Sequence, residues 1–222
     1  MEVLIMKSKL IKIVTIIVIF TLLPIFMGQD DCQVNDTINK LFDTINKKLP
    51  PPPGQNKMYI THLTFMDALT KTSIANTEVA ELINEAVIKG MNEAHKNNNK
   101  LAINEPGHII DNTDKNNNQL VNTTFDPNLT KSQKINKIIT EMMNPSHVDV
   151  IVTGHYIDDA QNPKVSIRPL VIVKHNQKIV TRNLQFAKKE LMCEDPNSKK
   201  KILCRGAHDQ IAQAVQELLE EL

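Results

Sequence analysis

Tryptophan is absent from this 222-residue sequence, and aromatic residues make up only 4% of it. Proteins that bind single-stranded nucleic acids stack the bases on aromatic side chains, which are scarce here. An excess of charge of one sign is also lacking, because 26 Lys and Arg residues face 25 Asp and Glu residues, giving a formal net charge of +1. Nucleic-acid-binding proteins are usually strongly basic, so the composition argues against nucleic acid as a partner.

Short motifs of common catalytic and cofactor sites are missing as well. The sequence contains no G-x-S-x-G nucleophile turn, no G-x-x-x-x-G-K-[ST] phosphate-binding loop and no H-E-x-x-H zinc motif. Asp111 and Asp114 precede several asparagines, but the central Gly and terminal Glu of a calcium loop do not follow. We therefore expect a protein that is not an enzyme and that carries no metal ion or cofactor.

The seven histidines are scattered along the chain, and none is paired with another at the spacing of metal ligands. We interpret them as residues of the surface or of sheet edges. They are His62, His95, His108, His147, His155, His175 and His208.

A positively charged start precedes a long apolar run at the N-terminus. Lys7, Lys9 and Lys12 are followed by apolar residues from Ile13 to Met27, with few interruptions. This order is typical of a secretory signal, and the run is just short of the ~17–25 residues that span a bilayer. Residues 1–28 are predicted to be a signal peptide or an N-terminal membrane anchor. In both cases the remainder lies outside the cytoplasm, because the positive charges stay inside.

Cleavage of this segment and its retention as an anchor both stay open. Pro24 and Gly28 favour cleavage because helix-breaking residues expose the bond to a signal peptidase, whereas Phe26 stands where a small residue is preferred. Cys32 follows the run as the cysteine of a lipoprotein would. Residues 29–31 are Gln, Asp and Asp, however, where lipidation requires apolar and small residues, so we do not expect Cys32 to be lipidated.

Residues 29–56 are predicted to form a short amphipathic helix followed by a proline-rich linker. Ile38, Leu41, Phe42 and Ile45 recur at helical spacing, and Pro50–Pro53 ends the helix because proline has no amide hydrogen to donate. The helix would either pack on the following domain or form a stalk that binds a partner. Four consecutive prolines make a semi-rigid spacer, which marks a domain boundary.

Strand and helix patterns alternate through residues 57–222. Short apolar or alternating runs, some of them rich in β-branched and aromatic residues, predict strands at residues 58–65, 101–103, 148–157, 165–173 and 177–191. Apolar residues at three- and four-residue spacing predict helices at residues 77–95, 132–143 and 207–222. Residues 104–131 are polar and rich in asparagine, and they are interpreted as a mobile loop. The order β-α-β-α-β-β-β-α predicts an α/β (α+β) domain, a mixed sheet packed by helices.

Cys193 and Cys204 flank a charged loop between the last predicted strand and the last predicted helix. In an oxidising compartment, two cysteines at this spacing predict a structural disulfide. His208 lies nearby, but a metal site would need a fourth ligand, and none stands at a suitable spacing.

The strand Val148–Tyr156, with the sequence VDVIVTGHY, resembles a strand of bacterial envelope proteins with the TolB-amino-terminal-like fold. That group includes the curli secretion channel, a flagellar outer-membrane protein and the lipoprotein activator of penicillin-binding proteins. The resemblance covers residues 57–222 and includes the order of the elements. It implies an accessory protein of the periplasm or cell surface, without catalytic residues. Residues 104–131 are too polar to face lipid, so we expect no pore.

These observations lead to an expected function, which is a non-catalytic accessory or scaffold role in the periplasm or cell envelope through protein–protein contacts. The expected partner is another envelope protein, such as a cell-wall synthase or a flagellar or secretion component, and a homo-oligomer is also possible. The alternative is an extracytoplasmic module that binds a small ligand or a metal ion beneath the asparagine-rich loop. A hydrolase with a non-standard site is a third hypothesis.

Overall fold

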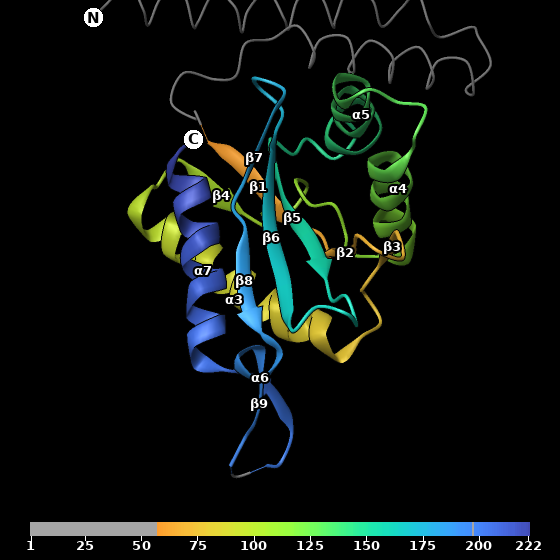
Figure 1. Ribbon diagram of the computed structural model, residues 1–222. Helices are drawn as coiled ribbons and strands as arrows, with labels where there is room; N and C mark the ends of the chain where they lie inside the picture. The colour runs from red at the N-terminus through yellow and green to blue at the C-terminus, as the bar shows by residue number, and fades with distance from the viewer. Residues whose placement is uncertain (1–56, 197) are drawn as a thin grey trace, which may run out of the picture. The chain divides into compact units, whose positions relative to one another are not determined.

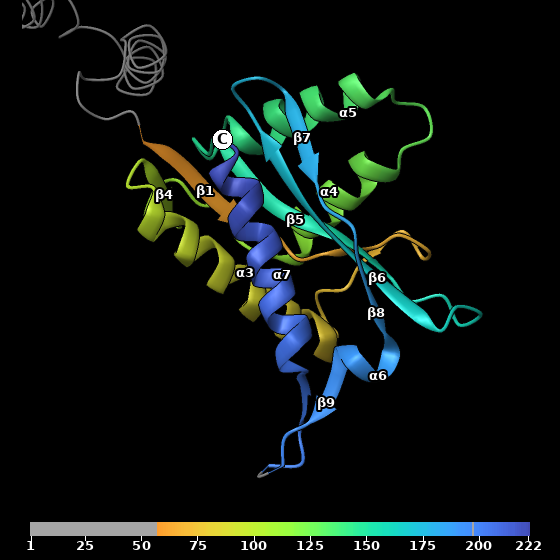
Figure 2. The same ribbon diagram turned by 60° about the vertical axis from the view of Figure 1, so that its left-hand side comes forward.

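A mixed β-sheet lies at the centre of the structure, with helices on both of its faces (Figures 1 and 2). The structure is a computed structural model, and it describes residues 57–222 with the exception of residue 197. The predicted leader, the linker and Cys32 lie outside the described residues. Within the described part of the chain, no helix combines the length and the apolar character needed to cross a membrane.

Three parallel strands and one long antiparallel strand form the larger part of the sheet. β1 (Met58–His62) lies between β4 (Leu101–Ile103) and β5 (Val150–Ile157) and is parallel to both. β6 (Lys164–Val173) pairs antiparallel with β5 along the whole length of β5. The parallel strands belong to β-α-β units, whose crossover connections require helices, whereas β5 and β6 need only a turn.

Shorter strands complete the sheet next to β6 and next to the end of β5. β7 (Lys178–Thr181) and β8 (Leu184–Ala187) pair antiparallel with β6 on the side away from β5. β2 (Met66–Asp67) pairs with the end of β5, and β3 (Thr72–Ser73) pairs with β2. The sequence-based assignment of an α/β fold with a mixed sheet is therefore confirmed, and the predicted order of elements roughly matches the structure.

Helices α3 (Glu78–Asn97) and α7 (Arg205–Glu220) pack side by side on one face of the sheet (Figure 2). The Thr77 side chain caps α3 by accepting a hydrogen bond from the amide of Ala80. Close packing of the two helices depends on Gly90, because a Cβ atom at this position would overlap the carbonyl oxygen of Ala212. The apolar stripes of both helices and one face of β5 form the larger hydrophobic core.

The opposite face of the sheet is covered by α4 (Asp114–Phe125), α5 (Lys131–Ile138) and a π-helical turn, η2 (Ile139–Met143). Their apolar side chains pack with Ile151 and Ile172 of the sheet in a second core. Alternate residues of β5 thus face different cores, since Val150 and Val152 belong to the first core. This alternation explains why β5 reads as a continuous apolar run.

Helix α4 corrects the prediction of a mobile loop over residues 104–131. Asparagine has a low helix propensity, so the sequence around α4 does not resemble a helix. Its N-terminus is capped by Thr113, and Leu120 and Val121 are buried in the second core. The segment before α4 is held to the sheet by Asn112, whose side-chain oxygen accepts hydrogen bonds from the amide (3.0 Å) and hydroxyl (2.7 Å) of Thr64. Tertiary packing has overridden the local preference.

The predicted strand over residues 177–191 is also corrected, because it is divided into β7, β8 and the short helix α6 (Lys188–Leu191). The break between β7 and β8 lies opposite Pro169 of β6. The carbonyl of Pro169 accepts hydrogen bonds from Arg182 N (3.3 Å) and Thr181 Oγ1 (2.9 Å), so its backbone faces the break. Proline has no N–H to donate there, and ladder pairing is interrupted without a change of register.

Other boundaries differ by smaller amounts. The first predicted strand ends at His62, and residues 63–65 separate β1 from β2. The predicted helix over residues 132–143 is divided between α5 and the π-helical turn η2. Helix α7 begins two residues before its predicted start.

Candidate interaction surface

A small hairpin projects from the sheet below α6, at the end of the domain opposite to the start of β1 (Figures 1 and 2). Its strands are β9 (Met192–Glu194) and β10 (Lys201–Leu203), which pair antiparallel with each other. A disulfide joins Cys193 to Cys204 across the base of the hairpin, with their Cα atoms 5.0 Å apart, as the sequence predicts. The hairpin is therefore a covalently closed projection.

Several contacts hold the base of this hairpin in place. The amide of Cys204 donates a hydrogen bond to the carbonyl oxygen of Leu191 (2.9 Å). Leu191 and Leu203 are both buried in the larger core, at opposite sides of the base. The disulfide also lies against α6, since the Cys204 sulfur is 3.6 Å from the carbonyl oxygen of Lys189. The base of the hairpin is consequently fixed by the core, by the backbone and by a covalent bond.

Six exposed basic residues surround this hairpin, and we call them the basic tip. They are Lys188, Lys189, Lys199, Lys200, Lys201 and Arg205. Three acidic residues accompany them, but two have local structural roles. The Glu190 carboxylate accepts a hydrogen bond from the amide of Ala187, and the Asp195 carboxylate accepts one from the amide of Ser198 in the hairpin turn. Glu194 is exposed and lies opposite Lys201 in the register of the two strands.

Half of the basic tip is used in ion pairs with the domain. Lys188 contacts Asp158 at 2.8 Å, Lys201 contacts Glu78 at 3.9 Å, and Arg205 contacts Asp209 at 3.8 Å. The other three residues, Lys189, Lys199 and Lys200, form no ion pair within residues 57–196 and 198–222. Their charges make no visible contribution to the fold, which leaves them available to a partner.

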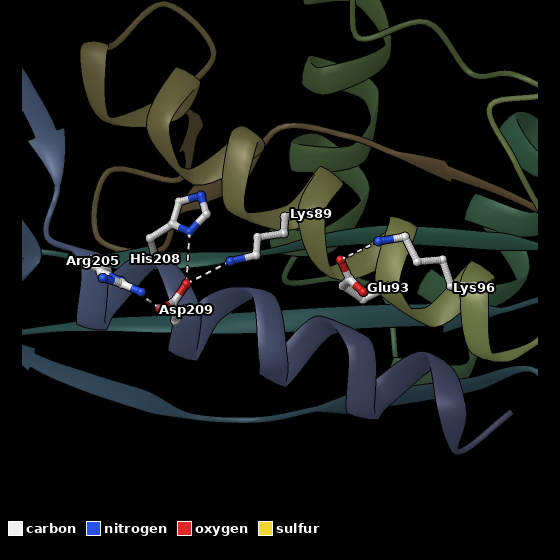
Figure 3. A network of polar contacts seen from close by, with 6 residues as sticks. All are labelled: Lys89, Glu93, Lys96, Arg205, His208 and Asp209. Atoms are coloured by element: carbon white, nitrogen blue, oxygen red, sulfur yellow. Dashed lines mark hydrogen bonds and ion pairs between the residues drawn. The ribbon is translucent and has the colours of Figure 1, made fainter.

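Asp209 connects the basic tip to the outer surface of the two packed helices (Figure 3). Its carboxylate accepts a hydrogen bond from Lys89 of α3 at 2.8 Å and lies 3.6 Å from His208. The hydrogen bond from Lys89 lowers the pKa of Asp209 below its ordinary value. Because Lys89 and Asp209 are exposed, we interpret the cluster as a surface link between α3 and α7.

Two histidines are more deeply buried than the sequence-based interpretation predicts, because it placed all seven at the surface or at sheet edges. Nδ1 of His62 and Nε2 of His155 are buried and have no hydrogen-bond partner among the residues that the structure describes. Burial lowers the pKa of both imidazoles, and the charge of Arg168 lowers that of His155 further. His155 also packs against the ring of Phe125, with 5.6 Å between the ring centroids. Both residues are therefore half-buried, each with one ring nitrogen enclosed by its neighbours.

Another pair of histidines meets although they are 39 residues apart in the sequence. His108 stacks on Tyr59 with 3.5 Å between the ring centroids, and its Nδ1 lies 2.9 Å from the carbonyl oxygen of His147. Sequence spacing gave no sign of this arrangement, because it depends on the loop between β4 and α4. Two imidazoles do not complete a metal site, and the described residues contain no group of three or more His, Cys, Asp or Glu side chains suited to a metal ion.

Adjacent carboxylates at Asp158 and Asp159 form the turn between β5 and β6, as their neighbours Asn162 and Pro163 indicate in the sequence. The Asp159 side chain accepts a hydrogen bond from the amide of Gln161 (2.9 Å). Asp158 accepts one from the hydroxyl of Tyr156 (3.3 Å). Burial, followed by the charge of Asp158, raises the pKa of Tyr156 to about 12. These groups stabilise the turn and hold Lys188.

In comparisons with known proteins, no protein-family model and no curated protein sequence matches this chain. The resemblance to the TolB-amino-terminal-like group therefore stays a prediction.

Proposed function

We propose that this chain is a non-catalytic accessory or scaffold protein of the cell envelope, and that it binds another envelope protein through the basic tip. The observation that carries this proposal is the closed, projecting hairpin with three lysines that form no ion pair within the described residues. A hairpin that is already rigid loses less conformational entropy when it binds a partner. Such rigidity is useful for recognition, whereas the stability of the core does not require it.

The proposed location rests on two further observations. Structural disulfides persist in oxidising compartments such as the periplasm, and Cys193 and Cys204 form one here. The predicted leader would carry the domain out of the cytoplasm. The domain would therefore work in the periplasm or at the cell surface, attached to the membrane if the leader is retained.

The alternative function, a module that binds a small ligand or a metal ion, loses the feature that suggested it. It assumed a loop over residues 104–131 that covers a pocket. Helix α4 occupies the centre of that segment and packs on the sheet through Leu120 and Val121. We therefore retain protein binding as the proposed function.

Site-specific photo-cross-linking of the full-length chain in intact cells tests this proposal. A photoreactive amino acid would replace Glu194, which is exposed on β9. As a control it would replace Lys137, which is exposed on α5 and belongs to the opposite side of the sheet. We expect an adduct with one dominant envelope protein from position 194 and none with that protein from position 137. Absence of an adduct from position 194, or the same adducts from both positions, would contradict the proposal.

A further inference from the structure

The three lysines without ion pairs in the described structure are arranged along the hairpin rather than gathered at one point. Lys189 lies at the base, beside the disulfide, whereas Lys199 and Lys200 lie at the far end. The backbone of Leu191 is opposite Cys204 and that of Asp195 is opposite Lys200. Four residue steps of extended chain, from Leu191 to Asp195, separate these two levels, which corresponds to about 13 Å. The available positive charge thus follows the length of the hairpin.

The acidic groups nearest to these lysines are held by other contacts. Asp158, Glu78 and Asp209 contact other members of the basic tip. Glu190 and Asp195 keep their charge but are oriented by hydrogen bonds from the backbone amides of Ala187 and Ser198, and Glu194 lies opposite Lys201. Residues 188–205 carry six basic and three acidic side chains, so this segment has a formal net charge of +3.

From this arrangement we infer that the partner of the basic tip is a protein with an acidic surface, in which Asp and Glu side chains are spread over about 13 Å. This inference rests on the proposed function and specifies the chemistry of the partner. Complementary charges at an interface steer association and select against partners of the wrong sign. The disulfide keeps the lysines in register with the acidic groups, since its closed loop limits the movement of the hairpin.

An anionic membrane surface is the other ligand that a strip of lysines could fit, and the composition of the hairpin turn disfavours it. Residues 195–200 include no large apolar side chain that could insert into lipid, so contact with a bilayer would rest on the charge of a few lysines alone. A protein partner with complementary charge fits this composition.

Charge reversal combined with cross-linking tests the inference in cells that produce the full-length chain. With the photoreactive residue at position 194, the substitutions K199E and K200E together should lower the yield of the partner adduct at least about tenfold, because like charges then face each other. The exposed pair K131E and K137E on α5 is the matched control and should leave the yield unchanged. Neutral K199Q and K200Q should give an intermediate yield. The disulfide in each variant is verified by mass spectrometry of non-reduced peptides.

Mapping of the adduct completes the test. The cross-linked segment of the partner should be rich in Asp and Glu, and replacing those residues with Lys should restore the adduct of the K199E and K200E chain. An adduct on a neutral or basic segment, or one that survives charge reversal, would overturn the acidic partner while leaving protein binding in place. Adducts with lipid alone would overturn the partner class. No adduct in any chain would overturn the proposed function as well.

Discussion

Gly154 shows how a single residue fixes the packing of the central strand. A Cβ atom built on Gly154 would overlap the aromatic ring of Phe65 and the carbonyl oxygen of Arg168. Gly154→Ala should therefore lower the free energy of unfolding by about 1–3 kcal/mol, the usual cost of overpacking. Gly206→Ala in α7 is the control, because no heavy atom lies within 4 Å of its added Cβ, and it should change this free energy by less than about 1 kcal/mol. Urea unfolding of the purified full-length chains measures both, and equal effects would refute the packing argument.

Asn117 is a second residue whose environment leads to a prediction. It is 1% exposed on α4, and neither its amide nitrogen nor its oxygen has a hydrogen-bond partner in the described part of the chain. A buried polar group without a partner costs about 1–3 kcal/mol, so Asn117→Leu should stabilise the protein by a similar amount. The neighbouring Asn118 is exposed, and Asn118→Leu should change stability by less than about 0.5 kcal/mol. A lower melting temperature for Asn117→Leu than for Asn118→Leu would contradict this explanation.

At the scale of elements, the β9–β10 hairpin depends on its disulfide. The double substitution Cys193→Ser with Cys204→Ser should lower the free energy of unfolding by roughly 3 kcal/mol, because the open loop gains entropy in the unfolded chain. Addition of a reductant to the unsubstituted protein should have the same effect. Cys32→Ser serves as the control and should leave stability unchanged, since Cys193 and Cys204 are paired with each other. Free alkylation of both thiols in the untreated protein would disprove the pairing.

Element boundaries show what could be predicted from the sequence and what could not. Helices α3 and α7 are recognisable because their apolar residues recur at helical spacing, and β5 and β6 because they are rich in β-branched residues. Helix α4 was missed because asparagines dominate it, and only its packing on the sheet reveals why it forms. The break between β7 and β8 was missed because its cause, Pro169, lies in the neighbouring strand.

The candidate surface was predictable to a similar degree. The spacing of Cys193 and Cys204 predicted the disulfide, and the run of lysines at residues 199–201 is visible in the sequence. Which lysines are neutralised was not predictable, because Asp158 and Glu78 are distant in the sequence and meet Lys188 and Lys201 only in the folded chain. Spacing in the sequence is enough to predict a disulfide or an amphipathic helix. Ion pairs between distant elements can be identified only once the tertiary structure is known.

For the whole molecule, the two half-buried histidines predict how stability depends on pH. Because burial lowers the pKa of His62 and His155 from 6.5, the unfolded chain binds protons that the folded protein excludes as the pH falls below 6.5. Their contribution is fully present above pH 6.5 and is lost as the pH falls from there towards the lowered pKa values. The free energy of unfolding should therefore be lower at pH 5 than at pH 7.5.

Substitution separates this contribution from that of the carboxylates. His62→Gln combined with His155→Gln should reduce the difference in free energy of unfolding between pH 5 and pH 7.5, measured by urea titration. His175→Gln, in the exposed turn after β6, should leave the difference as it is in the unsubstituted chain. If the double substitution leaves the difference unchanged, the histidines do not account for the acid sensitivity.

Pro169 has a consequence for the solubility of the molecule. Long, continuous edge strands are templates on which other chains add and aggregate. The edge of the sheet beside β6 is divided into two four-residue strands opposite Pro169, and Arg182 in the gap forms ion pairs with Glu217 (2.8 Å) and Glu221 (3.1 Å). A strand of a neighbouring molecule could pair with only four residues at a time on this edge, because Arg182 lies between the two short strands. One proline inside the sheet thus helps to keep crowded copies of the domain apart.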